Sequence, residues 1–132
     1  MTQARASIEG WWSSGRRVEV NLNGVDRQIF VRQMGSSAPM TLLHGFPSSS
    51  HDWVRLAPDL AESHRLLMFD FLGFGASEKP VQHDYSIGEQ ADLVEAIWAR
   101  EKITSTRILA HDYAVSVTQE LLARRAAGEP RS

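Results

Sequence analysis

The sequence predicts an α/β fold with a mostly parallel sheet of about five strands, helices on both faces, and an antiparallel hairpin at its start. Two β-rich segments separated by Asn23-Gly24 open the chain and predict the hairpin. Strand-like and helix-like segments then alternate three times, which is typical of parallel sheets joined by crossover helices. The later strand-like runs are continuously apolar, as expected of strands that are covered on both faces.

The composition is that of one globular domain. The 132 residues are 42% hydrophobic and 23% charged, with a net charge of −2 and no basic stripe, so we expect no nucleic-acid partner. The absence of cysteine excludes disulfides and cysteine-ligated metals. We expect no transmembrane segment and no signal peptide, and therefore a cytoplasmic location. The predicted domain covers residues 1–132, with an N-terminal arm at 1–15 and a tail at 128–132.

The first three strands follow from local pattern. Residues 16–20 (RRVEV) alternate between polar and apolar, and residues 27–33 (RQIFVRQ) are rich in β-forming residues. Asn23-Gly24 between them is the strongest short hairpin signal, because both residues tolerate positive φ. Residues 40–44 (MTLLH) form a continuous apolar run, which predicts a strand buried on both faces.

A helix and a fourth strand are expected next. Residues 53–61 (WVRLAPDLA) carry apolar residues at helical spacing, although Pro58 should weaken or bend that helix. Residues 64–71 (HRLLMFDF) predict another buried strand. The glycines and proline of LGFGASEKP, residues 72–80, then indicate a loop.

The clearest helix signal lies at residues 85–101, YSIGEQADLVEAIWARE. Ser86 and Glu89 have capping-box spacing, so each side chain is expected to accept a hydrogen bond from a free N–H group at the helix start. A fifth strand at 106–111 and a helix at 113–127 complete the predicted order. In such sheets, chemistry gathers at the carboxyl ends of the strands.

Three stretches at those strand ends carry a family resemblance. LLHGFPSSSHDW, MFDFLGFGASEKP and AHDYAVSVTQELL occur in the order and spacing of the α/β-hydrolase fold, which the chain resembles over residues 11–130. The His-Asp-Tyr stretch is similar to that of the epoxide hydrolase and haloalkane dehalogenase branch. DFLGFG and HDYA are similar to stretches in the mesoderm-specific transcript proteins. The family's acid and histidine follow its nucleophile, so the chain resembles the amino-terminal half of the fold.

The resemblance implies a nucleophile elbow at Ala110, Asp112 and Ala114, where the small residues permit a strained turn. Asp112 would attack a carbon atom of a small apolar epoxide, alkyl halide or ester and form an alkyl-enzyme ester. The helix that begins near Tyr113 would help keep the carboxylate ionised. The implied oxyanion hole uses the backbone N–H groups of Phe46 and Tyr113.

The expected substrate pocket comprises six residues, and Phe46-Pro47 among them looks like the epoxide-hydrolase version, since halide-binding relatives tend to carry Asn at that position. No cofactor and no metal are expected. The six residues are His44, Gly45, Phe46, Pro47, His111 and Tyr113.

Other interpretations remain open. Asp112 is also a favoured helix N-cap, and the alternative role for His44 is to brace loop backbone. No histidine follows Asp112 in these 132 residues, so a second interpretation is a catalytically incomplete fragment that acts as an interaction or assembly module. Its last strand would form a sheet edge prone to self-association. A serine-type hydrolase acting through Ser116 is a further alternative, although no serine occupies the elbow.

Overall fold

The predicted hairpin is present and opens the sheet. In the computed structural model, which describes residues 8–128, β1 (Arg16–Leu22) pairs antiparallel with β2 (Val25–Met34). Asn23 and Gly24 join them with φ values of 55° and 90°. A two-residue hairpin turn that matches the twist of its strands needs positive φ at both positions, which explains this residue pair.

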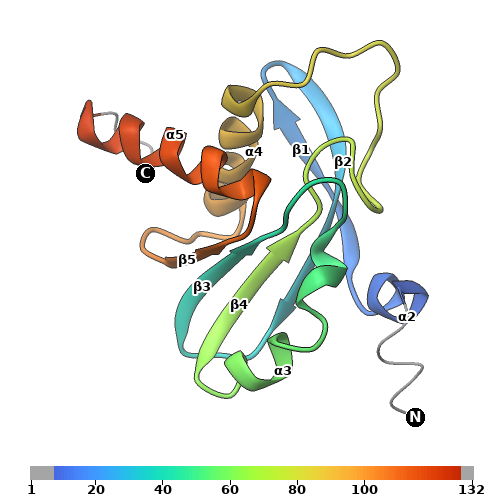
Figure 1. Cartoon of the computed structure of the whole chain (residues 1–132), viewed down its shortest axis with the longest axis vertical. Helices are drawn as coiled ribbons and strands as arrows, with labels where there is room; N and C mark the ends of the chain where they lie inside the picture. The colour runs from blue at the N-terminus through green and yellow to red at the C-terminus, as the bar shows by residue number, and fades with distance from the viewer. Residues whose placement is uncertain (1–7, 129–132) are drawn as a thin grey trace.

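The hairpin continues into a mixed sheet with the order β1-β2-β4-β3-β5, drawn in Figure 1. Strand β2 pairs antiparallel with β4, whereas β4 and β3, and β3 and β5, pair in parallel. The last strand therefore lies at an edge of the sheet, as expected. The three later strands are β3 (Ala38–Leu43), β4 (His64–Phe69) and β5 (Arg107–Ala110).

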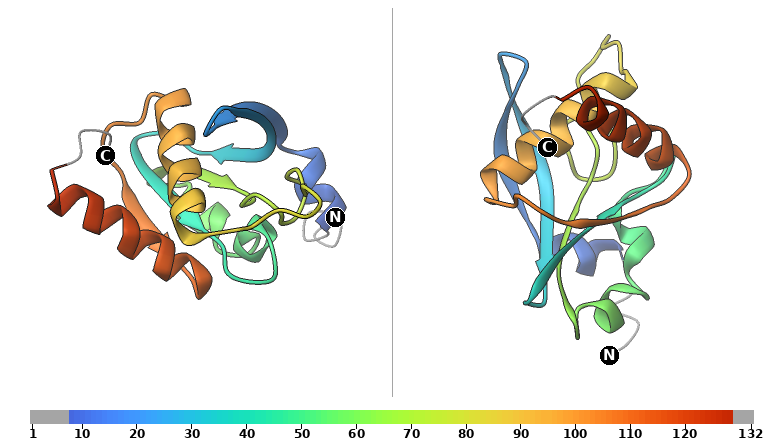
Figure 2. Two further views of the ribbon diagram at one scale, coloured as in Figure 1. Left: turned by 90° about the horizontal axis from the view of Figure 1, so that it is seen from above. Right: turned by 90° about the vertical axis from the view of Figure 1, so that its left-hand side faces the viewer.

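The sheet separates two hydrophobic clusters, which confirms helices on both faces. Leu67 and Phe69 of β4 pack with the long helices α4 (Ile87–Arg100) and α5 (Tyr113–Ala126). Leu66 and Met68, which alternate with them, pack on the opposite face. That face is covered by three short elements, which Figure 2 shows away from α4 and α5. They are α2 (Ile8–Ser13), η1 (Ser50–Trp53) and α3 (Ala57–Leu60).

One local expectation is wrong. Residues 53–61 form no continuous helix, because the chain divides into η1 and α3. Pro58 has no N–H group to donate to a carbonyl one turn earlier, so it sits in the first turn of a new helix instead. The described part of the expected arm at 1–15 includes α2, whose Trp11 is buried; residues 1–7 and 129–132 lie outside the described part of the chain.

The start of α4 forms only half of the expected capping box. Ser86 Oγ accepts a hydrogen bond from the Glu89 N–H group at 3.0 Å, as predicted. The Glu89 carboxylate binds His83 Nε2 at 2.8 Å instead of returning to the Ser86 backbone.

Within residues 8–128, no helix is both long and apolar enough to cross a bilayer.

Candidate active site

The turn between β5 and α5 has the backbone of a strained elbow. Asp112 adopts φ 58° and ψ −117°, which is a costly conformation for a residue with a side chain. It occupies the N-cap position of α5, yet its side chain makes no capping hydrogen bond. An ordinary N-cap role therefore does not explain an aspartate at this position.

The loop after β3 approaches this elbow closely enough to require glycine. A Cβ atom placed on Gly45 would lie 2.8 Å from Asp112 Cβ and 2.9 Å from His111 Cδ2. The Phe46 N–H group donates a hydrogen bond to Asp112 Oδ2 at 3.2 Å. One carboxylate oxygen is thus held by backbone, and the residue as a whole is exposed.

The peptide that holds the carboxylate is itself held in place. The Gly45 carbonyl accepts hydrogen bonds from His44 Nδ1 at 2.7 Å and from the Ser48 N–H group at 3.3 Å. Because the peptide is planar, fixing this carbonyl also fixes the direction of the Phe46 N–H group. The loop therefore presents a preorganised donor to Asp112.

His44 is a fully buried brace beneath that loop. Its Nε2 accepts a hydrogen bond from the Phe71 N–H group at 3.0 Å, while its Nδ1 donates to Gly45. This pair of partners requires the neutral ring. Burial lowers the pKa of His44, outweighing the Gly45 hydrogen bond and the charges of Asp70 and Asp52, which raise that pKa. The geometry matches the interpretation of His44 as a loop brace.

Asp70, at the end of β4, ties two loops together. Its Oδ1 accepts a hydrogen bond from the Ser50 N–H group and its Oδ2 one from the Ala76 N–H group, each at 2.8 Å. The side chain is fully buried, so both oxygens are committed to backbone donors. This carboxylate orders the walls around the site and has no oxygen free for a substrate.

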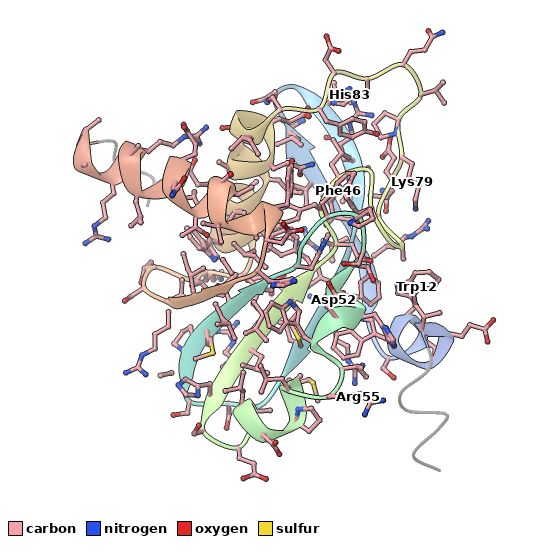
Figure 3. All side chains as sticks on the ribbon, in the orientation of Figure 1. Trp12, Phe46, Asp52, Arg55, Lys79 and His83 are labelled. Carbon is pink, nitrogen blue, oxygen red and sulfur yellow. The ribbon has the colours of Figure 1, made fainter. Side chains whose placement is uncertain are left out.

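A pocket of about 500 Å³ opens beside the elbow. Three of the six expected pocket residues line it, whereas His44, Gly45 and His111 do not. Asp112 is not a lining residue either, although its neighbour Tyr113 and its partner Phe46 both are. Figure 3 marks Phe46 and Lys79, which come from the loops after β3 and β4. The lining residues are Phe46, Pro47, Gly73, Phe74, Gly75, Lys79, Tyr85 and Tyr113.

Five of these residues escaped the sequence analysis, and all five come from the segment between β4 and α4. The available signal was the position of LGFGASEKP at the carboxyl end of a buried strand. Its glycines had indicated only a loop. Gly73 permits close packing, because a Cβ atom there would lie 2.6 Å from the ring of Tyr85.

Aromatic rings form the walls of the pocket. The Phe46 and Phe74 ring centroids are 5.8 Å apart, and those of Phe74 and Tyr113 are 5.9 Å apart. Burial raises the pKa of the Tyr113 phenol, so the hydroxyl is neutral at ordinary pH. The pocket therefore offers a mostly apolar environment for a small organic molecule.

Two other kinds of site have little support. Residues 8–128 hold no group of three or more His, Asp or Glu side chains arranged to bind a metal ion. Ser116 is exposed on α5, four residues beyond the elbow position, and does not occupy the strained turn.

The strand-to-helix elbow, the glycine loop facing it and the sheet order define an α/β hydrolase. The chain belongs to that family: a family model for the alpha/beta hydrolase fold matches residues 38–117. A solved alpha/beta hydrolase fold protein from Burkholderia ambifaria superposes with a TM-score of 0.71 at 38% identity, covering 84% of this chain and 39% of that chain. The epoxide hydrolase CorEH superposes with a TM-score of 0.70 at 28% identity, covering 79% and 36%.

Several individual relatives are similar to the chain. The mesoderm-specific transcript homolog protein of Bos taurus is 44% identical over 125 residues, which are 92% of this chain and 37% of the relative. The putative hydrolase LipZ of Mycobacterium tuberculosis is 44% identical over 119 residues, which are 89% and 40%. A haloalkane dehalogenase of Agrobacterium fabrum is 34% identical over 86 residues, which are 65% and 28%. The resemblance to mesoderm-specific transcript proteins is confirmed, and the chain spans about two-fifths of the first two relatives.

Proposed function

We propose that this chain carries the nucleophile of a hydrolase that acts through an alkyl-enzyme ester, with Asp112 attacking a carbon atom of a small epoxide. The observation that carries the proposal is the carboxylate of Asp112, held through Oδ2 by the Phe46 N–H group in a strained turn without a capping role. Strain of this kind persists where the surrounding structure enforces it, and it gathers at functional sites.

The two carboxylate oxygens have different surroundings, and this supports a division of roles. Oδ2 accepts the hydrogen bond from Phe46, so it is suited to become the carbonyl oxygen of the ester. Oδ1 is left to attack carbon.

The first step, formation of the ester, requires only the carboxylate, the epoxide and water. Oδ1 forms a bond to a ring carbon of the epoxide, and the bond between that carbon and the ring oxygen breaks. The electron pair stays on the oxygen, which takes a proton from water and becomes a hydroxyl group. The product is a hydroxyalkyl ester of Asp112, and hydrolysis of that ester needs a water molecule activated by a base.

These 132 residues supply no evident base for the second step. No histidine follows Asp112, and among the described residues its carboxylate bonds to the Phe46 N–H group, not to a histidine. We therefore expect the ester to accumulate to one adduct per chain. A base contributed by further polypeptide would allow turnover.

A covalent trap tests the proposal. The chain is incubated with 1,2-epoxyhexane, its intact mass is measured, and the adduct is mapped by peptide mass spectrometry. We expect an increase of one epoxide mass, located on Asp112 and absent from the Asp112→Asn variant. The matched control is Asp59→Asn, which removes an exposed carboxylate on α3 and should label like the parent. Equal labelling of Asp112→Asn would disprove the nucleophile assignment.

An alkyl halide is the second candidate substrate, favoured by the relatives whose names are haloalkane dehalogenase and fluoroacetate dehalogenase. The same attack by Asp112 would release a halide ion. Halide-binding relatives tend to carry Asn at the position of Phe46, and Phe46 lacks the side-chain amide of Asn. We therefore rank epoxides first. Parallel labelling with 1-bromohexane compares the two classes, and a faster reaction with the bromide would reverse the ranking.

An assembly role is the alternative of a different class. Strand β5 pairs only with β3 within the described sheet, and Leu109, Val115 and Leu122 nearby are 36%, 44% and 58% exposed. Unpaired strand edges beside exposed apolar groups favour association with another chain. Formation of a stable oligomer without any labelling of Asp112 would favour this role over the enzymatic one.

A further inference from the structure

A buried amide joins the helix behind the site to one wall of the pocket. Gln90 lies in the first turns of α4 and is fully buried. Its own N–H group donates to the Ser86 carbonyl at 3.1 Å, so its backbone is satisfied within the helix. The side-chain amide is therefore committed to other partners, and none of the steps proposed above uses it.

The partner of the side-chain amide is Leu72, at the start of the loop that forms one wall of the pocket. Gln90 Oε1 accepts a hydrogen bond from the Leu72 N–H group at 3.2 Å, and Gln90 Nε2 donates to the Leu72 carbonyl at 3.0 Å. The amide bonds the N–H and the carbonyl of Leu72, as the backbone of a neighbouring β-strand would. It fixes both backbone polar groups of Leu72, and Gly73 and Phe74 of the pocket follow directly.

The opposite wall packs directly on the segment that Gln90 holds. The ring centroids of Phe74 and Tyr113 are 5.9 Å apart, and those of Phe71 and Tyr113 are 5.8 Å apart. Leu72 lies between Phe71 and Phe74 in the chain, so its two hydrogen bonds to Gln90 fix the backbone whose rings face Tyr113.

We infer that Gln90 is a positioning residue that sets the spacing between Phe74 and Tyr113, and thereby determines which substrate shapes reach Asp112. This inference rests on the proposed function, because its measurable effect is the selectivity of ester formation at Asp112. Gln90 acts through the wall that begins at Leu72 and does not contact the reacting atoms. Small changes in the placement of a wall are sufficient to alter reaction rates, because attack requires near-contact geometry.

The variant that isolates this role is Gln90→Met, which keeps the length of the side chain and removes both amide groups. It leaves the buried N–H and carbonyl of Leu72 without their partner. The matched control is Gln33→Met on β2, where the buried amide nitrogen has no hydrogen-bond partner in the described part of the chain and does not line the pocket. Gln90→Glu is a third variant that keeps the acceptor for the Leu72 N–H group.

The experiment measures the rate of Asp112 ester formation with a narrow probe, 1,2-epoxyhexane, and a broad one, styrene oxide. We expect Gln90→Met to lower the ratio of narrow to broad rates by at least about fivefold, because a Phe74 wall that is no longer held at Leu72 accommodates the broad ring. Gln33→Met should keep the parent ratio, and Gln90→Glu should lie between the two.

The outcomes separate the inference from the proposed function. If the parent labels Asp112 with both probes but Gln90→Met keeps the parent ratio to within about twofold, the positioning role is wrong and the nucleophile stands. If Gln33→Met changes the ratio as strongly, the effect is general loosening and the inference is again wrong. If Gln90→Met does not melt cooperatively, Gln90→Glu provides the test. A narrow-to-broad rate ratio below that of the parent supports the positioning role, and the parent ratio contradicts it. A parent chain that labels with neither probe removes both claims.

Discussion

Gly45→Ala is the substitution that tests the elbow geometry most directly. The added Cβ atom would lie 2.8 Å from Asp112 Cβ and 2.9 Å from His111 Cδ2, roughly 0.5 Å inside the 3.4 Å at which ordinary contact begins. Asp112 Cβ is attached directly to the elbow backbone, so relief of the contact has to move the turn or the Gly45 loop. Either movement separates the Phe46 N–H group from the carboxylate.

The expected cost follows from overpacking in a rigid site. Inserting a methyl group into a packed region typically costs about 1–3 kcal/mol of unfolding free energy. For a domain of this size, each kcal/mol lowers the melting temperature by roughly 3–5 °C, so we expect a decrease of about 3–15 °C. A displacement of roughly 1 Å at the reacting groups also predicts about a hundredfold slower labelling of Asp112.

Thermal melting and adduct mass spectrometry on the same preparation check both parts of this prediction. The matched control is Gly24→Ala, at a position with φ 90° and no atom within 4 Å of the added Cβ, so it introduces backbone strain without a contact. We expect the control to melt lower by a few degrees and to label Asp112 at the parent rate. A Gly45→Ala chain with the parent melting temperature and labelling rate would refute the close approach of the two loops.

Three further predictions concern stability. Because burial lowers the pKa of His44, its unfolded form binds a proton below about pH 6.5 while the folded form resists it. Urea titrations should therefore show stability falling as the pH drops below that value, by up to about 1.4 kcal/mol per pH unit, and His44→Asn should lose this component. Ser86→Ala removes the acceptor for the Glu89 N–H group and should cost about 1 kcal/mol in the same assay. Arg124→Met removes the cation 2.8 Å from the carboxylate of Glu95, whose side chain is 3% exposed, and should cost about 3 kcal/mol; a cost below that of Ser86→Ala would contradict it.

The sequence predicts the sheet well because its strongest signals are local. A positive-φ pair between alternating segments leaves few conformations besides a hairpin, and buried apolar runs leave few besides central strands. The continuous helix at 53–61 fails for a local reason as well, since Pro58 favours a fresh helix start over a bend. Helix α2 went undetected because its six residues give too short a stretch for helical periodicity to stand out.

The pocket is harder to predict, because its walls are set by contacts between segments far apart in the chain. Sequence order indicates that Phe46 and Tyr113 lie at neighbouring strand ends, and both line the pocket. It does not indicate that Tyr85 closes over Gly73, since that packing depends on the path of the loop between β4 and α4. Nor does it indicate that Gln90 holds the pocket wall at Leu72, because one buried amide leaves no periodic signal.

Asp70 and Asp112 show why the assignment of a nucleophile needs geometry as well as sequence. Both are aspartates that follow a strand, Asp70 directly after the largely buried β4 and Asp112 two residues after the partly exposed β5, and both accept hydrogen bonds from backbone N–H groups. Asp70 accepts one 2.8 Å bond on each oxygen in a fully buried site, so attack on a substrate would break a bond that orders the loops. Asp112 accepts one bond, on Oδ2, and is exposed, so the proposed attack through Oδ1 would leave the hydrogen bond from the Phe46 N–H group unbroken. Under the proposed function, the number of oxygens that the backbone occupies, more than the residue type, separates the structural carboxylate from the reactive one.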